Sequence, residues 1–148
     1  MSGGLRYLLD TNVLSETRRK QADPKVMAFL DAVDADSLFI SVLTIGELRK
    51  GIAIKRRTDP DAARSLAAWV DGMEQSFADR IVPIDAAVSR RWGELSADRS
   101  RPVIDTLIAA TALVHGLTLV TRNGSDMRGI DVPIIDPWEG RRPARTKK

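Results

Sequence analysis

Five short apolar segments, separated by stretches with helical periodicity, are the feature that most restricts how this chain can fold. The segments span residues 5–9, 38–41, 81–84, 117–121 and 132–135. They are apolar on both faces, which is typical of strands that are covered on two sides. Strands of this kind that alternate with helices predict a three-layer α/β/α domain with a mainly parallel sheet of about five strands.

Helical periodicity fills most of the gaps between these segments. Ser41 can cap a helix whose apolar residues recur at helical spacing, and a longer apolar stripe runs through residues 60–77. Asp85 can cap a further helix, and another follows Pro102 and stops at Gly116. Because parallel strands share one carboxyl edge, ligands of such a fold are expected there, near a switch in strand order.

The length of the chain, 148 residues, suits one domain that needs neither a metal ion nor a disulfide to fold. We expect this domain over residues 1–140 and a basic, disordered tail over residues 141–148. The tail, RRPARTKK, holds five basic residues and no acidic one. The net charge of +3 becomes −2 without it, so the folded part is expected to be nearly neutral.

The absence of cysteine and the presence of a single histidine, His115, restrict the possible chemistry. Thiol catalysis, disulfides and thiolate zinc sites are excluded, and a histidine-activated nucleophile is disfavoured. No apolar run has the length of a membrane span, and the first residues lack the regions of a secretory signal. We therefore expect a cytoplasmic protein with no membrane partner.

Four acidic residues stand at strand ends or on apolar helix faces: Asp10, Glu47, Asp105 and Asp126. Taken singly, each has an ordinary structural explanation as a helix cap, an exposed helix residue or a turn residue. Taken together, they can converge on one cleft at the carboxyl edge of the sheet. Four neighbours would add neutral oxygen groups as a second layer: Thr11, Asn12, Thr121 and Asn123.

Carboxylates that share a desolvated cleft repel one another, so a positive group must compensate them. The sequence places no buried-looking lysine or arginine beside each of these acids. Mg²⁺ and Mn²⁺ prefer carboxylate oxygens as ligands and could supply the positive charge instead. The sequence therefore predicts a hard divalent cation that activates water. A phosphatase with an aspartyl nucleophile is an alternative, but its Asp-x-Asp pattern is broken here at Asn12.

Four stretches then resemble the PIN-domain ribonucleases, and more closely the VapC and FitB-type toxins of bacterial type II toxin–antitoxin pairs. They are LLDTNVLSE, ISVLTIGELRKGI, DTLIAATALVHGLTLVTRN and DMRGIDVPIIDPW, within residues 5–138. The resemblance implies that the catalytic acids are Asp10, Glu47, Asp105 and Asp126. Metal would be bound by Asp10, Asp105 and Asp126, with Glu47 binding directly or through water.

The resemblance also implies an activity and partners. These are a Mg²⁺- or Mn²⁺-dependent endoribonuclease with an RNA substrate, a homodimer, and a cognate VapB-like antitoxin in the active-site groove. In the alternative, a FitB-like regulatory subunit acts on DNA only through its antitoxin and has little nuclease activity. Candidate contacts to RNA phosphates are the basic stretches 17–20 and 55–57 together with Arg49 and Lys50.

Overall fold

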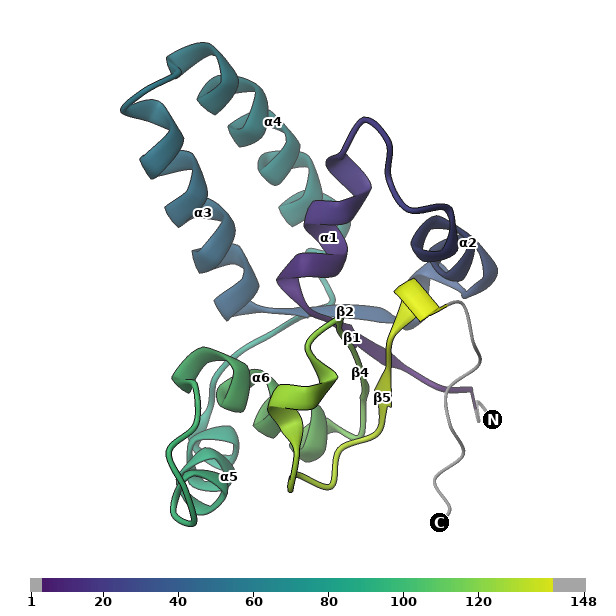
Figure 1. Ribbon diagram of the computed structural model, residues 1–148, viewed down its shortest axis with the longest axis vertical. Coiled ribbons are helices and arrows are strands. Elements are labelled where there is room, and N and C mark those ends of the chain that lie inside the picture. The colour runs from purple at the N-terminus through teal and green to yellow at the C-terminus, as the bar shows by residue number, and fades with distance from the viewer. Residues whose placement is uncertain (1–3, 140–148) are drawn as a thin grey trace.

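Five parallel strands form the middle layer of the computed structural model, which describes residues 4–139 (Figure 1). They are β1 (Tyr7–Leu9), β2 (Leu38–Ser41), β3 (Ile81–Val82), β4 (Thr118–Val120) and β5 (Ile134–Ile135). Their order is β3-β2-β1-β4-β5, and every neighbouring pair is parallel. The predicted five-stranded α/β sheet is confirmed, with shorter strands than the apolar segments suggested. The expected tail at 141–148 lies outside the described residues.

Within residues 4–139, six α-helices cover the two faces of the sheet (Figure 1). One face carries α1 (Thr11–Arg18), α2 (Pro24–Ala32), α3 (Val42–Arg56) and α4 (Pro60–Ser76), and the other carries α5 (Ala86–Ser96) and α6 (Val103–His115). Three short 3-10 turns, η1 (Ala35–Ser37), η2 (Gly124–Met127) and η3 (Pro137–Glu139), complete the described chain. None of the helices within residues 4–139 has the length and apolarity needed to cross a membrane.

Helix boundaries follow from the capping residues in the sequence. The Ser41 hydroxyl accepts a hydrogen bond from the Leu43 amide at 3.0 Å and begins α3, and Asp85 accepts one from Val88 at 3.0 Å and begins α5. Gly116 ends α6 with a φ of 66°, a left-handed conformation in which glycine is strongly favoured. These three assignments agree with the sequence pattern.

Two apolar layers hold the helices against the sheet. Successive residues of a strand point to opposite faces, so Leu9 packs under the helices α1 to α4 while Leu8 packs under α6. The same alternation places Val120 in the first layer and Leu119 in the second. Burial on both faces explains why the strands are apolar at consecutive positions.

The order of the strands places a switch beside β1. The chain runs from β1 to β2 and β3 on one side of the sheet, and then returns to β4 and β5 on the other side. The chain leaves the carboxyl ends of β1 and β4, which are adjacent, toward opposite sides of the sheet. A crevice opens between two such connections, and α/β proteins bind ligands there. The segments that follow β1 and β4 therefore lie at the expected position of a functional site.

Leu119 provides a test of this packing, because its side chain is fully buried in the central sheet. Leu119→Ala should lower the free energy of unfolding by about 2–5 kcal/mol through lost burial and a residual cavity. Leu5→Ala, at a residue that is 57% exposed, should change it by less than about 0.5 kcal/mol. Urea unfolding measures both. Equal effects of the two substitutions would contradict the assignment of Leu119 to the core.

Candidate functional site

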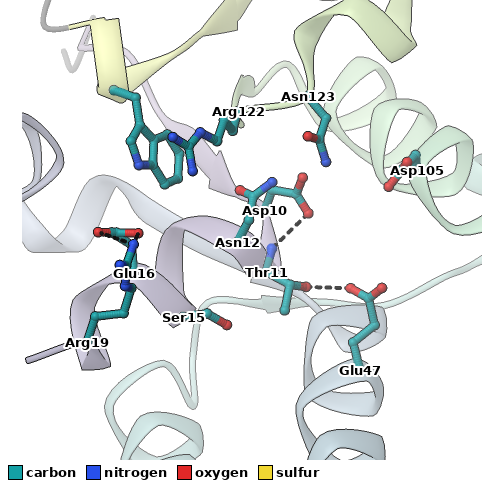
Figure 2. Close-up of a pocket in the computed structure, with 11 residues that line it drawn as sticks. Asp10, Thr11, Asn12, Ser15, Glu16, Arg19, Glu47, Asp105, Arg122 and Asn123 are labelled. Atoms are coloured by element: carbon teal, nitrogen blue, oxygen red, sulfur yellow. Dashed lines mark hydrogen bonds and ion pairs between the residues drawn. The ribbon is translucent and has the colours of Figure 1, made fainter. Parts of the chain in front are cut away.

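A cleft with a volume of about 470 Å³ opens at the switch in strand order (Figure 2). Three of the four predicted acids line it, namely Asp10, Glu47 and Asp105. The predicted polar residues Thr11, Asn12 and Asn123 line it too, together with Ser15, Glu16, Arg19, Arg122 and Trp138. The structure thus brings together side chains from α1, α3, α6 and the segments that follow β4 and β5.

Asp10 stands at the centre of the cleft and is held on both of its oxygens. Asp10 is 5% exposed, and its carboxylate accepts one hydrogen bond from the Thr11 amide at 2.7 Å and another from the Thr121 hydroxyl at 2.7 Å. Its own amide donates to the Val120 carbonyl at 2.9 Å. Asp10 is therefore the helix cap of α1 and a cleft residue at the same time, and the two explanations of its position do not compete.

Glu47 accepts a side-chain hydrogen bond from Thr11, the residue that follows Asp10. The Thr11 hydroxyl donates to the Glu47 carboxylate and lies 3.1 Å from the hydroxyl of the buried Thr44 (Figure 2). Glu47 itself is exposed on α3. Thr11 consequently links α1 to α3 and directs the Glu47 carboxylate toward the cleft.

Asp105 lies half-buried in the first turn of α6. Burial raises the pKa of its carboxyl above the ordinary value of 3.8, and the nearby charges of Asp10, Asp126 and Glu47 raise that pKa further. The other three predicted acids are thus close enough to act electrostatically on Asp105. Asp126, in η2, is exposed and is not among the residues that line the cleft.

The predicted polar residues divide into two groups. Thr121 is fully buried behind the cleft, where its hydroxyl holds Asp10 and accepts a hydrogen bond from the Asn123 amide at 3.0 Å. Asn12 faces the cleft, and its buried Oδ1 atom has no hydrogen-bond partner within residues 4–139. A buried oxygen without a partner is costly, so Asn12 marks a place where a bound group or water can be accommodated.

The donor types in the cleft fit a hard divalent cation. Carboxylates and the free Asn12 oxygen are ligands of the kind that Mg²⁺ and Mn²⁺ prefer, and neither sulfur nor imidazole is present among the residues that line the cleft. As the side chains stand, however, no three acidic or histidine residues in the described part of the chain are close enough to hold one metal ion. Charge repulsion acts over longer distances than coordination, so the other three acids raise the pKa of Asp105 without forming a closed ligand set with it.

Five cleft residues were not predicted from the sequence as catalytic, metal-binding or second-layer residues, although Arg19 lies in the stretch 17–20 that was predicted to contact RNA: Ser15, Glu16, Arg19, Arg122 and Trp138. A signal existed for the first three, because positions 12, 15, 16 and 19 recur at the spacing of one helix face. Glu16 is 5% exposed, and an amide hydrogen bond from Asp23 at 2.8 Å, followed by contact with Arg19, lowers the pKa of its carboxyl. Trp138 packs in the apolar core and also lines the cleft.

The residues predicted to contact RNA differ in how close they lie to the cleft and in whether their charges are already paired. Arg19, within the stretch 17–20, lines the cleft. Arg49 is instead occupied by ion pairs of 2.6 Å with Asp71 and with Glu74, which raise the pKa of its guanidinium. Lys50 borders a neighbouring apolar groove on α3. Contact of these residues with RNA remains a prediction, and Arg49 is the least available of them.

Sequence comparison identifies the class of protein that this fold and cleft define. The pattern of the PIN domain family matches residues 7–132, and the chain belongs to that family.

Among its relatives is VapC ribonuclease Y4jK of Sinorhizobium fredii, 37% identical over 142 residues, which span 89% of this chain and 97% of the relative. Toxin FitB of Neisseria gonorrhoeae is 33% identical over 140 residues, with 88% and 97% covered. The predicted resemblance to VapC and FitB toxins is confirmed.

Solved structures agree with this membership. The structure of FitAB bound to an IR36 DNA fragment superposes with a TM-score of 0.81 at 30% identity, over 89% of this chain and 95% of that one. FitAcB from Neisseria gonorrhoeae superposes with a TM-score of 0.82 at 32% identity, over 89% and 98%. The three-layer architecture is therefore that of these toxins.

Asp105 allows a test of the electrostatics of the cleft. Because its folded-state pKa lies above 3.8, its charge destabilises the fold at neutral pH, and that stability is regained as the pH falls through the folded-state pKa. Asp105→Asn should therefore melt at a higher temperature than the unchanged chain at neutral pH in a chelator. The difference should disappear in acid, below the ordinary pKa of a carboxyl.

The control for this experiment is Asp31→Asn, which alters an exposed residue of α2 outside the cleft. It should leave the melting temperature nearly unchanged at both pH values. A lower melting temperature for Asp105→Asn at neutral pH would show that the Asp105 charge is stabilised rather than opposed by its surroundings.

Proposed function

We propose that the chain is a metal-dependent endoribonuclease that hydrolyses RNA phosphodiester bonds as the toxin of a VapBC-type toxin–antitoxin pair. The observation that carries this proposal is the convergence of Asp10, Glu47 and Asp105 in one cleft at the switch in strand order. The relatives named VapC ribonuclease and Ribonuclease VapC4, the latter 33% identical and from Mycobacterium tuberculosis, support the same activity.

In this proposal, Asp10, Asp105 and Asp126 hold one or two Mg²⁺ or Mn²⁺ ions, with Glu47 binding directly or through water. A bound ion of this kind would polarise a phosphoryl oxygen and lower the pKa of a water, which would supply the nucleophile that replaces the leaving ribose oxygen at phosphorus. The exposure of Asp126 and Glu47 leaves their side chains room to turn toward Asp10.

The remaining polar residues have positioning roles in the same proposal. Thr121 and the Thr11 amide fix the Asp10 carboxylate, and the Thr11 hydroxyl fixes Glu47. Asn12 and Asn123 offer oxygens that can orient water in the cleft. Such prearranged polar groups stabilise developing charge without reorganising during the reaction. The phosphatase alternative lacks support, because the match to the PIN domain family adds to the break in its motif at Asn12.

A protein partner is part of the proposal. A similar protein has been solved in a toxin–antitoxin complex from Klebsiella pneumoniae. Five large apolar side chains of this chain are at least 37% exposed on α3 and α6: Val42, Ile54, Val103, Ile104 and Val114. Exposed apolar patches mark protein interfaces. We propose that a VapB-like antitoxin and a second copy of the chain use such surfaces, and that the protein acts in the cytoplasm.

A regulatory role on DNA is a second candidate, favoured by the similarity to FitAB bound to a DNA fragment. In that role the antitoxin contacts the DNA, and this chain is carried as the partner subunit. A regulatory subunit of this kind would have little nuclease activity, so measurement of RNA cleavage by the isolated chain separates the two candidates.

Asp10→Asn gives the most direct test of the nuclease proposal. It should lower Mg²⁺-dependent cleavage of defined RNAs by at least about a hundredfold, since it removes a fixed charge from the proposed ligand set. A chelator should abolish cleavage by the unchanged chain. Asp31→Asn, outside the cleft, should cleave normally. Retention of full activity by Asp10→Asn at limiting metal would refute the assignment.

The partner proposal is tested with the product of the small reading frame beside the gene. Co-expression should give a stable complex in which RNA cleavage is inhibited, and light scattering should give the mass of a dimer for the chain alone. A product that neither binds the chain nor inhibits it would contradict the toxin–antitoxin assignment, and a monomeric mass would contradict the homodimer.

A further inference from the structure

The cleft has two chemically different sides. Figure 2 shows Arg19 and Arg122 on one side, Glu47 and Asp105 on the other, and Asp10 between them. We call Asp10, Glu47 and Asp105 the acidic wall and the two arginines the arginine wall. The acidic wall alone repels any polyanion, so binding of a nucleic acid strand here requires cationic groups beside it.

Arg122 is held in place without being neutralised. Its guanidinium lies 4.7 Å from the centroid of the Trp138 ring. Its side chain makes no ion pair or hydrogen bond with any other residue in the range 4–139, although carboxylates line the same cleft. An arginine normally pairs with a nearby carboxylate, so the ring of Trp138 keeps the five N–H donors of Arg122 available for a ligand.

Arg19 forms an ion pair with a buried acid, Glu16. Its Nη1 atom donates to Glu16 at 3.2 Å, and Glu16 is fixed in turn by the Asp23 amide at 2.8 Å. The Arg19 side chain is 65% exposed, whereas that of Glu16 is 5% exposed. Glu16 therefore anchors one nitrogen of Arg19 and leaves the remaining donors facing solvent at the cleft.

We propose that Arg19 and Arg122 form a phosphate-binding subsite that holds a backbone phosphate of the RNA strand beside the acidic wall, with Trp138 positioning Arg122. The inference rests on the proposed function, which supplies RNA as the substrate. Guanidinium groups match phosphate oxygens in planar, two-point hydrogen bonds. Because phosphate contacts fix the register of a strand without reading its bases, this subsite positions the RNA and does not select its sequence.

Binding of RNA without cleavage tests the subsite. The probe is a fluorescein-labelled single-stranded oligoribonucleotide of mixed sequence, titrated with the full chain in a chelator at several salt concentrations. Arg122→Gln and Arg19→Gln should each weaken binding several-fold at low salt. Each should also lower the slope of log affinity against log salt by about 0.7, as expected for one lost phosphate contact to a single strand.

Arg90→Gln is the matched control, because Arg90 is exposed on α5 and is not part of the cleft. It removes the same charge and should change neither the low-salt affinity nor the slope by a comparable amount. Equal slopes for Arg122→Gln and the unchanged chain, equal losses in all three variants, or no binding of the oligoribonucleotide by the unchanged chain would each overturn the inference.

The positioning role of Trp138 needs a separate readout. Trp138→Phe keeps a ring beneath Arg122 and should retain most of the binding, whereas Trp138→Leu should bind as weakly as Arg122→Gln. In the Arg122→Gln background, Trp138→Leu should cause no further loss. A further loss of the same size would mean that Trp138 acts independently of Arg122 and would overturn its positioning role.

The test separates the inference from the nuclease proposal, because the chelator removes the need for catalysis. Loss of binding in the arginine variants without cleavage by the unchanged chain would support the subsite and refute the nuclease. Normal binding by both arginine variants, together with cleavage that requires Asp10, would support the nuclease and refute the subsite.

Discussion

The parallel pairing of β1 with β4 is the constraint on which the cleft depends. Leu8 lies beside Leu119 and Leu9 beside Val120 in this pairing, so the two strands end together at the switch in strand order. Asp10 follows one strand end, and its two links to the neighbouring strand end, one through its backbone and one through its carboxylate, continue the register of the sheet. The central acid is therefore positioned by the apolar core rather than by a loop.

This arrangement stores electrostatic repulsion at one edge of an otherwise apolar domain. Asp105 carries the clearest sign of it, since burial and three neighbouring acids raise its pKa. Perturbed groups of this kind are frequent at functional sites. A cation between the acids would relieve the repulsion, and the arginine wall would offset it for a bound strand. The fold thus accepts a local loss of stability where the proposed chemistry needs charge.

Much of the fold could be predicted because its signals are local. Strands that are buried on both faces are apolar at consecutive positions, and α3 and α5 begin at side chains that cap them. The sequence pattern did not delimit α1 and α2, since α2 buries only Val26 fully and one of the three buried residues of α1 is the charged Glu16. Neither helix has a wide apolar stripe to mark its length.

The site could be predicted only where its residues stand at strand ends or interrupt an apolar helix, as Asp10 and Asp105 do. The roles of Arg122 and Glu16 depend on contacts with Trp138 and Asp23, and no periodicity marks such contacts. Asp126 was expected among the metal ligands, but it is not among the residues that line the cleft, and its charge raises the pKa of Asp105.

The most direct test of the central claim is anomalous X-ray diffraction from crystals of the chain grown with Mn²⁺. The account predicts an anomalous peak inside the cleft, coordinated by carboxylate oxygens of Asp10 and Asp105, with the Thr121 hydrogen bond to Asp10 retained. Ordered Mn²⁺ found only at other surfaces, or acid side chains that stay apart at saturating Mn²⁺, would contradict the claim that this cleft is a metal centre.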